Sequence, residues 1–251
     1  MKKLTKFFGF LLLSFLTVTA TQAQDASLDD ILSTYFENIG GEDNWKKVKS
    51  IKMSGNFSMQ GMEMPTTVYV MEPAYQKSET DFQGKQFVRA YDGETAWMIN
   101  PFMGGPDPQK LSEEETRQMS KQKFQDEFID YEKKGHKVEL VGTEEVDGAE
   151  AYKIKMIKKD GDIVFYYFDM DNYVPIMVKA LIDFGPQKGQ AMEMYMSDYQ
   201  EVDGLMMAHT TEQKVNGAVV FSMTMDKIEL NPEGIEASMF AFPEKEEKEE
   251  K

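Results

Sequence analysis

Apolar residues first recur along this chain at helical spacing. Between Ser27 and Ile39 they fall three or four residues apart, which predicts an amphipathic helix. Ser27 can cap the N-terminus of this helix, and Gly40-Gly41 follow its last apolar residue and predict its end. Trp45 and the residues around it predict a short second turn of helix.

At Ser50 the period of the pattern changes to two, which predicts a strand with one apolar face. Gln60-Gly61 fits a two-residue hairpin turn, and this turn sets the register of the strand that follows. The predicted pairs are Met59 with Met62, Phe57 with Met64, Gly55 with Thr66, Met53 with Val68, and Ile51 with Val70. Directly opposed residues share a face, so the hairpin carries an apolar stripe along one face.

Similar turn signals recur between runs rich in Val, Ile, Tyr, Phe, Met and Thr. They are Gln83-Gly84, Asp92-Gly93, Asp147-Gly148, Asp160-Gly161, Asp203-Gly204 and Asn216-Gly217. They predict about 10–11 antiparallel strands in meander order. One segment interrupts the strands: we predict a loop over Pro101–Pro108, then a helix that a capping box opens at Ser112 and that runs to about Lys133.

A long antiparallel sheet with few helices indicates an α+β fold, and so large a sheet tends to curl. We predict a single domain over residues 24–243. Residues 244–251 are all charged and are predicted to be disordered.

Residues 1–23 have the layout of a secretory signal peptide. Basic residues precede an apolar run from Phe7 to Val18, and Thr21-Gln22-Ala23 offers a cleavage site with a small residue at its end. The apolar run is shorter than a membrane span, so we predict that this segment is cleaved on export. The chain has no Cys to carry a lipoprotein anchor, which predicts a soluble protein of the periplasm.

The formal net charge of the chain is −16. Loss of the signal peptide would remove Lys2, Lys3 and Lys6 and no acid, which takes the charge to −19. A chain so acidic repels phosphate backbones and anionic lipid surfaces, so we expect it to bind no nucleic acid.

Catalytic chemistry has no evident place in this sequence. The chain holds two histidines, His136 and His209, which lie far apart and are both predicted on a polar face or a strand edge. It has no nucleophile elbow, phosphate-binding loop, dinucleotide-binding glycine pattern or zinc-protease motif. We therefore predict a protein that is not an enzyme and needs no cofactor.

The 20 methionines allow two interpretations. Thioether sulfur is a soft ligand for Cu(I), and the stretch "FSMQGMEMP" at 57–65 places three methionines within six residues. Methionine also fills apolar surfaces that must adapt their shape. The methionines follow the alternation of the strands and no His or Cys lies among them, which favours the apolar surface over a copper site.

The stretch "DGETAWMINPF" resembles a motif of the periplasmic lipoprotein carrier LolA. The matching residues are Asp92, Gly93, Thr95, Trp97, Asn100, Pro101 and Phe102, and Ile99 stands where an aromatic residue is usual. The N-terminal helix that ends in Gly-Gly and the stretch "SDYQEVDGLMMAH" at 197–209 are similar to the outer-membrane lipoprotein-sorting proteins of the Bacteroidetes.

This resemblance implies a LolA-like fold, a curled and unclosed antiparallel β half-barrel with helices packed as a lid over an apolar cavity. It implies an acylated lipoprotein or another lipid as cargo, and membrane release or acceptor proteins as partners of a monomeric carrier. In the family a strand arginine couples lid opening to cargo, and no motif assigns that role to Arg89. A non-catalytic sensing or interaction module is the alternative on the same fold.

The residues predicted to line the cavity are Met53, Phe57, Met59, Met62, Met64, Val68 and Trp97, with Tyr195, Tyr199, Phe221, Met223 and Met225. Three further methionines do not fit one face. If Asp203-Gly204 is a two-residue turn, Met192, Met194 and Met196 point away from Met223 and Met225. Either that loop is longer, or the three residues pack on the other side of the sheet.

Overall fold

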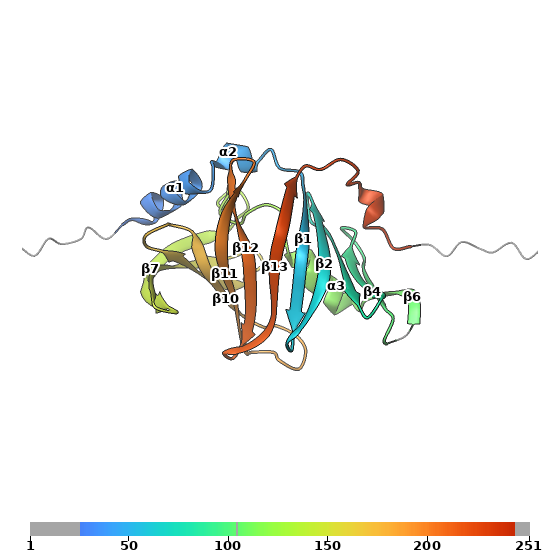
Figure 1. The fold of residues 1–251 in the computed structure, drawn as a ribbon. Coiled ribbons are helices and arrows are strands. Elements are labelled where there is room, and N and C mark those ends of the chain that lie inside the picture. The colour runs from blue at the N-terminus through green and yellow to red at the C-terminus, as the bar shows by residue number, and fades with distance from the viewer. Residues whose placement is uncertain (1–25, 104, 244–251) are drawn as a thin grey trace, which may run out of the picture.

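The computed structural model of this chain describes residues 26–103 and 105–243 (Figure 1). The predicted signal peptide and the predicted charged tail lie outside the described residues. Among the helices of the described part, none is both long and apolar enough to cross a membrane.

The helices of the described ranges are α1 (Leu28–Asn38), α2 (Glu42–Trp45), α3 (Glu113–Lys121) and the short 3₁₀ helix η1 (Ala237–Met239). The first helix begins where the sequence predicts, because the Ser27 hydroxyl accepts a hydrogen bond from the Asp30 amide. The Asp30 carboxylate in turn accepts a hydrogen bond from the Ser27 amide, which completes a capping box.

The strands of the first half are β1 (Ser50–Met59), β2 (Met62–Met71), β3 (Tyr75–Phe82), β4 (Lys85–Tyr91), β5 (Ala96–Asn100) and β6 (Gly105–Lys110). Those of the second half are β7 (Lys137–Val146), β8 (Ala149–Ile157), β9 (Ile163–Asp169), β10 (Pro175–Leu181), β11 (Ala191–Val202), β12 (Leu205–Val215) and β13 (Ala218–Leu230). All 13 belong to one sheet of order β6-β5-β4-β3-β2-β1-β13-β12-β11-β10-β9-β8-β7.

The chain enters this sheet in its middle (Figure 1). It runs outward from β1 to the edge strand β6, crosses through α3 to the other edge at β7, and returns to the middle, where β13 pairs with β1. The two edge strands do not pair with each other, so the predicted α+β fold with a curled, unclosed half-barrel is confirmed.

The predicted loop over Pro101–Pro108 is wrong in its second half, where β6 pairs with β5. Proline is tolerated there because an edge strand needs hydrogen bonds on one side only. This strand helps to raise the number of strands above the predicted 10–11.

The predicted helix from Ser112 to about Lys133 is also too long. Its capping box at Ser112 is confirmed, but α3 ends at Lys121 and the chain continues in turns. Two contacts take the place of helical hydrogen bonds: the Phe124 amide donates to the Pro73 carbonyl oxygen, and the Phe128 amide donates to the Asp126 carboxylate. Tertiary contacts thus override a run of good helix formers.

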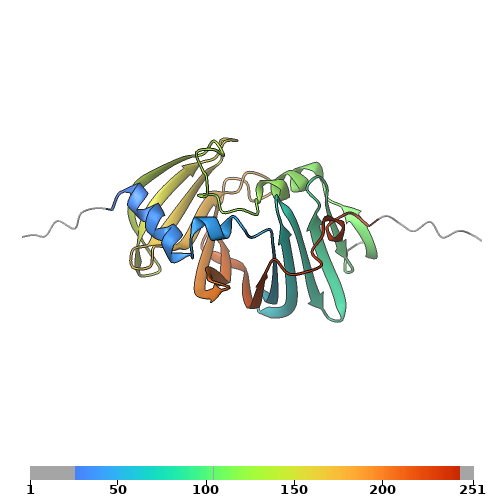
Figure 2. The ribbon, with the colours of Figure 1, turned by 90° about the horizontal axis from the view of Figure 1, so that it is seen from above.

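All three α-helices pack against the same face of the sheet, which we call the inner face (Figure 2). The largest buried cluster lies between α1 and strands β8 and β9, where Ile31, Tyr35, Ile154 and Phe168 are in contact. A second cluster lies beneath α2 at the middle of the sheet. The C-terminal segment takes the other side, the outer face, where Phe242 packs against strands β4 and β5.

The pairing of β1 with β13 requires a glycine at position 55. A Cβ atom there would collide with the carbonyl oxygen of Thr224 and lie against Met225. The register shifts at this point, where β13 carries a β-bulge between Met225 and Lys227. Glycine is therefore needed because the backbone of β13 approaches so closely, and not because of its own backbone conformation.

We predict that Gly55→Ala lowers the free energy of unfolding by about 1–3 kcal/mol, the usual cost of overpacking. Urea unfolding followed by circular dichroism measures this change. Ser54→Ala, one residue earlier on the same strand, is the matched control and should change stability much less. Equal stability of the Gly55→Ala variant and the wild type would contradict the close approach of β13.

Candidate functional site

The predicted apolar stripe exists, and it continues onto a third strand. The register predicted for β1 and β2 is confirmed at every pair from Ile51–Val70 to Met59–Met62. On the other side of β1, Phe57 lies opposite Met223 and Gly55 lies opposite Met225. The stripe thus spans β2, β1 and β13 at the centre of the inner face.

A β-bulge in β13 resolves the conflict over the three methionines of β11. Both turns are two-residue turns, since Val202 pairs with Leu205 and Val215 pairs with Ala218. The register shifts within β13, where Gln213 pairs with Phe221 but Lys214 pairs with Val219. This shift of one residue reverses the faces beyond it.

As a result, the register places Met192, Met194 and Met196 on the same face as Phe221 and Met223. Neither a longer loop nor packing on the other side is needed. Thr211 and Gln213 of β12 lie between the two groups of methionines on this face.

One half of the stripe is covered. Phe124, from the segment after α3, and Trp45 of α2 pack against the cluster to which Met53, Val68 and Met225 belong. The Trp45 side chain is itself fixed, because its indole nitrogen donates to the Ile39 carbonyl oxygen at 2.9 Å. At this end the predicted lining residues form part of a sealed core.

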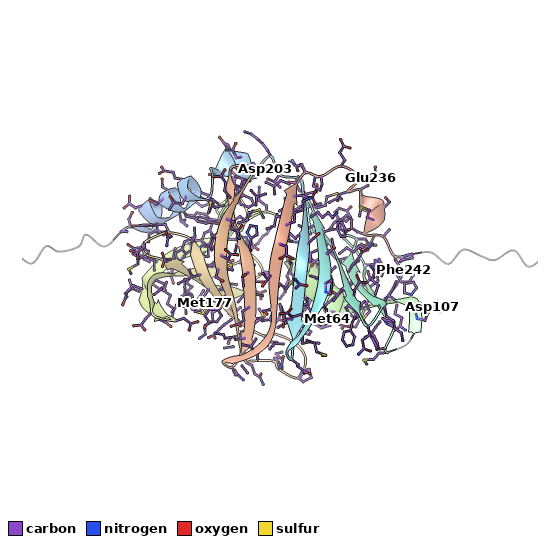
Figure 3. All side chains as sticks on the ribbon, viewed as in Figure 1. Met64, Asp107, Met177, Asp203, Glu236 and Phe242 are labelled. Carbon is purple, nitrogen blue, oxygen red and sulfur yellow. The ribbon has the colours of Figure 1, made fainter. Side chains whose placement is uncertain are left out.

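In the other half, Met223 alone packs against a described buried cluster, the one beneath α2, and the remaining residues belong to none of these clusters. We call this the open half of the stripe, and its residues are Phe57, Met59, Met62, Met64, Phe221 and Met223. Met64 is buried, Met59 and Met62 are exposed, and the rings of Phe57 and Phe221 lie 5.4 Å apart. Figure 3 shows Met64 toward the end of the sheet opposite to that of Asp203.

Uncharged side chains continue on the inner face beside the open half. On β3 these are Ser78 and Thr80, and the Thr80 hydroxyl lies 2.9 Å from that of Thr66 on β2. Positions of this face on β1, β2 and β3 carry no ionisable side chain, as the register shows. The open half is therefore a surface that can exclude water without leaving a charge unpaired.

Trp97 does not belong to the stripe. Its predicted place is in the lining of the cavity on the inner face, and this prediction is wrong because Trp97 lies on the outer face. It lies opposite Ala90 on the outer face, while Ala96 and Tyr91 face α3. Its indole nitrogen donates to the buried Phe240 carbonyl oxygen at 2.8 Å. The residue thus holds the C-terminal segment against the sheet.

Two predicted tyrosines also lie elsewhere. Tyr195 is on the outer face beside Met177, with the Lys214 ammonium 3.9 Å from its ring centroid. Tyr199 packs against the cluster beneath α1, and its hydroxyl donates to the Pro175 carbonyl oxygen at 2.6 Å. The left-handed backbone of Asp198, with φ of 54°, interrupts the alternation of β11 just before Tyr199.

A polar bridge fixes α3 across the inner side of the half-barrel. One side of the helix packs against β4 and β5. On its other side, the Lys121 ammonium lies 2.8 Å from a carboxylate oxygen of Asp162 and 2.6 Å from one of Asp183. These acids follow β8 and β10, so Lys121 joins the two halves of the chain. The sequence carries no signal for this contact.

A buried carboxylate fixes the segment after α3. The Tyr35 hydroxyl of α1 donates to Asp126 at 2.6 Å, and the Phe128 amide donates to its other oxygen at 2.7 Å. Burial raises the pKa of Asp126 above its ordinary value, although these two hydrogen bonds act in the opposite direction. Asp126 therefore ties the crossing segment to the core beneath α1.

Two hollows in the described part lie away from the open half of the stripe. One of about 570 Å³ lies at the opposite end of β12 and β13 and is lined by Asp203, His209 and Asp226. Another of about 450 Å³ lies between Tyr91 and α3. His209 is buried, with its Nδ1 atom 3.0 Å from the Met207 carbonyl oxygen, so its predicted place on a polar face or strand edge is wrong.

Comparison with known proteins shows the fold. No protein-family model matches this sequence, and no curated protein matches it. A DUF1329-family protein from Desulfovibrio piger has a similar structure, with a TM-score of 0.56 at 12% identity over 84% of this chain and 97% of that chain.

Two further structures are similar. A domain from Vibrio parahaemolyticus described as an outer membrane lipoprotein-sorting protein has a TM-score of 0.51 at 15% identity, over 85% of this chain and 95% of that chain. A LolA-superfamily protein from Nitrosomonas europaea has a TM-score of 0.52 at 10% identity, over 86% and 98%. The fold of this chain is therefore LolA-like.

We predict that Trp97→Phe lowers the free energy of unfolding by about 1–3 kcal/mol, because it leaves the buried Phe240 carbonyl oxygen without a donor. Limited proteolysis should then cleave the chain within residues 232–243 faster than in the wild type. Uptake of a fluorescent fatty acid should not change. Loss of uptake at unchanged stability would instead place Trp97 at a binding surface.

We predict that Lys121→Met loosens α3, measured as lower hydrogen-exchange protection of its amides at pH 7. The global free energy of unfolding should change by less than about 1 kcal/mol, since the pair is partly exposed. Lys123→Met is the matched control, because Lys123 is exposed and donates to the Ser120 carbonyl oxygen of its own segment.

The same bridge should respond to acid. Its hydrogen bond from Lys121 holds the pKa of Asp183 below its ordinary value. A depressed pKa contributes stability that is present above the ordinary carboxylate pKa, about 3.9, and is lost as the pH falls through the folded-state value. Protection factors of α3 amides in the wild type should fall in that acidic range, and those of Lys121→Met should not.

Proposed function

We propose that this protein is a periplasmic carrier or binder of acylated cargo, most simply of lipoproteins destined for the outer membrane, and that it uses no covalent chemistry. The observation that carries this proposal is the open half of the stripe. It combines long apolar side chains with uncharged neighbours on a LolA-like sheet. Acyl chains are the cargo whose chemistry matches such a surface.

The energetics favour a chain-like ligand. Each methylene group that leaves water contributes about 0.8 kcal/mol, so binding grows with the length of the acyl chain. Methionine side chains can follow the shape of the ligand when it enters and can fill the space when it leaves. The covered half of the stripe would stop the acyl chain at α2, so that only the open half exchanges cargo.

We predict that Met223→Glu weakens binding of a fluorescent fatty acid by about tenfold or more, because a buried charge would face the acyl chain. Thr224→Glu is the matched control, since Thr224 is exposed and is the next residue on the same strand. Fluorescence titration measures both. Equal loss in the two variants, at equal stability, would sink the assignment of the inner face.

The same titration gives a quantitative check on the nature of the site. A series of saturated fatty acids of rising length should bind about fourfold more tightly for each added methylene group.

Mass spectrometry of lipids that co-purify with the periplasmic protein would identify acyl species directly. The copper alternative is tested in parallel by anaerobic Cu(I) titration against a chelator, which should show no competition.

A further inference from the structure

The two ends of this sheet differ in chemistry. In an antiparallel meander, successive connections alternate between the ends of the sheet. One end holds five connections: β2–β3, β4–β5, β7–β8, β9–β10 and β11–β12. The opposite end holds six connections, and the crossover from β6 to β7 through α3 is counted with neither end. Each of the five connections at the first end carries an acid: Glu72, Asp92, Asp147, Asp171 and Asp203. We call this the acidic end.

The central turns at the opposite end carry no charge. Gln60-Gly61, Gln83-Gly84 and Asn216-Gly217 connect β1 to β2, β3 to β4 and β12 to β13 (Figure 1). Of the acids at this end in the second half, Asp162 and Asp183 are paired with Lys121 of α3, whereas Asp160 in the β8–β9 connection is exposed. This end can therefore approach an apolar medium at a lower electrostatic cost than the acidic end.

Exposed apolar side chains gather at this same end. Of the nine large apolar residues that are exposed in the described part, eight adjoin connections at this end. These eight form what we call the apolar rim: Met59, Met62, Phe102, Met103, Ile163, Leu181, Val219 and Val220. Leu181 is 68% exposed and Val219 is 57% exposed. The ninth residue, Val141, lies on the edge strand β7.

We propose that the apolar rim docks on the surface of a lipid bilayer of zwitterionic phospholipid. Met59 and Met62 belong both to the rim and to the open half of the stripe. A bilayer at the rim would therefore adjoin the stripe at its uncovered end. Docking itself does not depend on cargo binding; only the transfer of an acyl chain between bilayer and stripe rests on the proposed function.

The distribution of the rim fits a bilayer better than a folded partner. Its residues lie one or two to a connection on five separate connections, from β1–β2 to β12–β13, and they do not form one compact patch on one element. A fluid interface can accommodate each tip separately, whereas a protein partner would need a complementary surface of the same width. The net charge of −16 excludes tight contact with anionic lipid and turns the acidic end away from the membrane.

Vesicle flotation tests this proposal, with the chain purified from the periplasm and its N-terminus determined by mass spectrometry. Vesicles of phosphatidylcholine alone should carry the wild type upward in a density gradient. Leu181→Glu combined with Val219→Glu should lower the bound fraction by about tenfold or more, since both place a charge against apolar lipid. Val141→Glu adds the same charge to an exposed apolar site away from the rim and should leave flotation unchanged.

A neutral pair, Leu181→Asn with Val219→Asn, should also weaken flotation, which separates loss of apolar contact from added charge. Circular dichroism melts establish that each variant is folded, and fatty-acid uptake measured in the same samples reports on the proposed function separately. Failure of the wild type to float would overturn the proposal, as would equal loss in Val141→Glu. Sedimentation that shows a wild-type dimer dispersed by Leu181→Glu, without flotation, would assign the rim to a second copy instead.

Discussion

The pairing of β1 with β13 is the interaction on which the rest of this structure depends. It joins the first strand of the chain to the last, and without it the two meanders would be separate sheets, each with one more edge. The strands are about 170 residues apart, so their contact closes a long loop at an entropic cost that grows slowly with length. Gly55 allows the close approach, and the bulge in β13 accommodates it.

This pairing also creates the candidate site. Phe57 and Met64 belong to one hairpin, and Met223 reaches them only because β13 lies beside β1. The second bulge, at Val220, turns the methionines of β11 to the same face. Both irregularities therefore decide which side chains meet on the inner face. Coverage by α2 and Phe124 then decides that the stripe is sealed at one end and uncovered at the other.

Features governed by local chemistry could be predicted from the sequence. The capping boxes at Ser27 and Ser112 and the hairpin at Gln60-Gly61 depend on residues a few positions apart, and the structure confirms all three. The bulge at Val220 could not be predicted, because residues 218–221 are all apolar and their pattern does not reveal a change of face. A uniform run specifies its register weakly.

The other errors have a similar origin in tertiary contacts. Both faces of β5 are apolar or small, so the alternation alone does not say which face of the sheet Trp97 joins. The residues after Ser112 favour a helix, which is why the sequence predicts a continuous one. In the structure Asp126 instead accepts hydrogen bonds from Tyr35 and Phe128 and holds this segment against the core. A hydrogen bond between side chains far apart in the sequence does not change the local pattern of apolar and polar residues, so the pattern cannot predict it.

The choice of turn residues carries information of a different kind. Gln60, Gln83, Asp147, Asp203 and Asn216 all precede glycine and all have φ near 50°, at 53°, 52°, 48°, 50° and 50°. Asp and Asn serve this left-handed position about equally well, so folding does not require acids at the two turns of one end and amides at the three of the other. The Asp160-Gly161 turn between β8 and β9 departs from this division, since it places an acid at the end of the amides. At these five turns the choice between acid and amide is therefore free to serve a requirement outside the fold. A protein whose one end contacts apolar material has such a requirement. Carboxylates at that end would lose water at every contact, and this desolvation costs free energy.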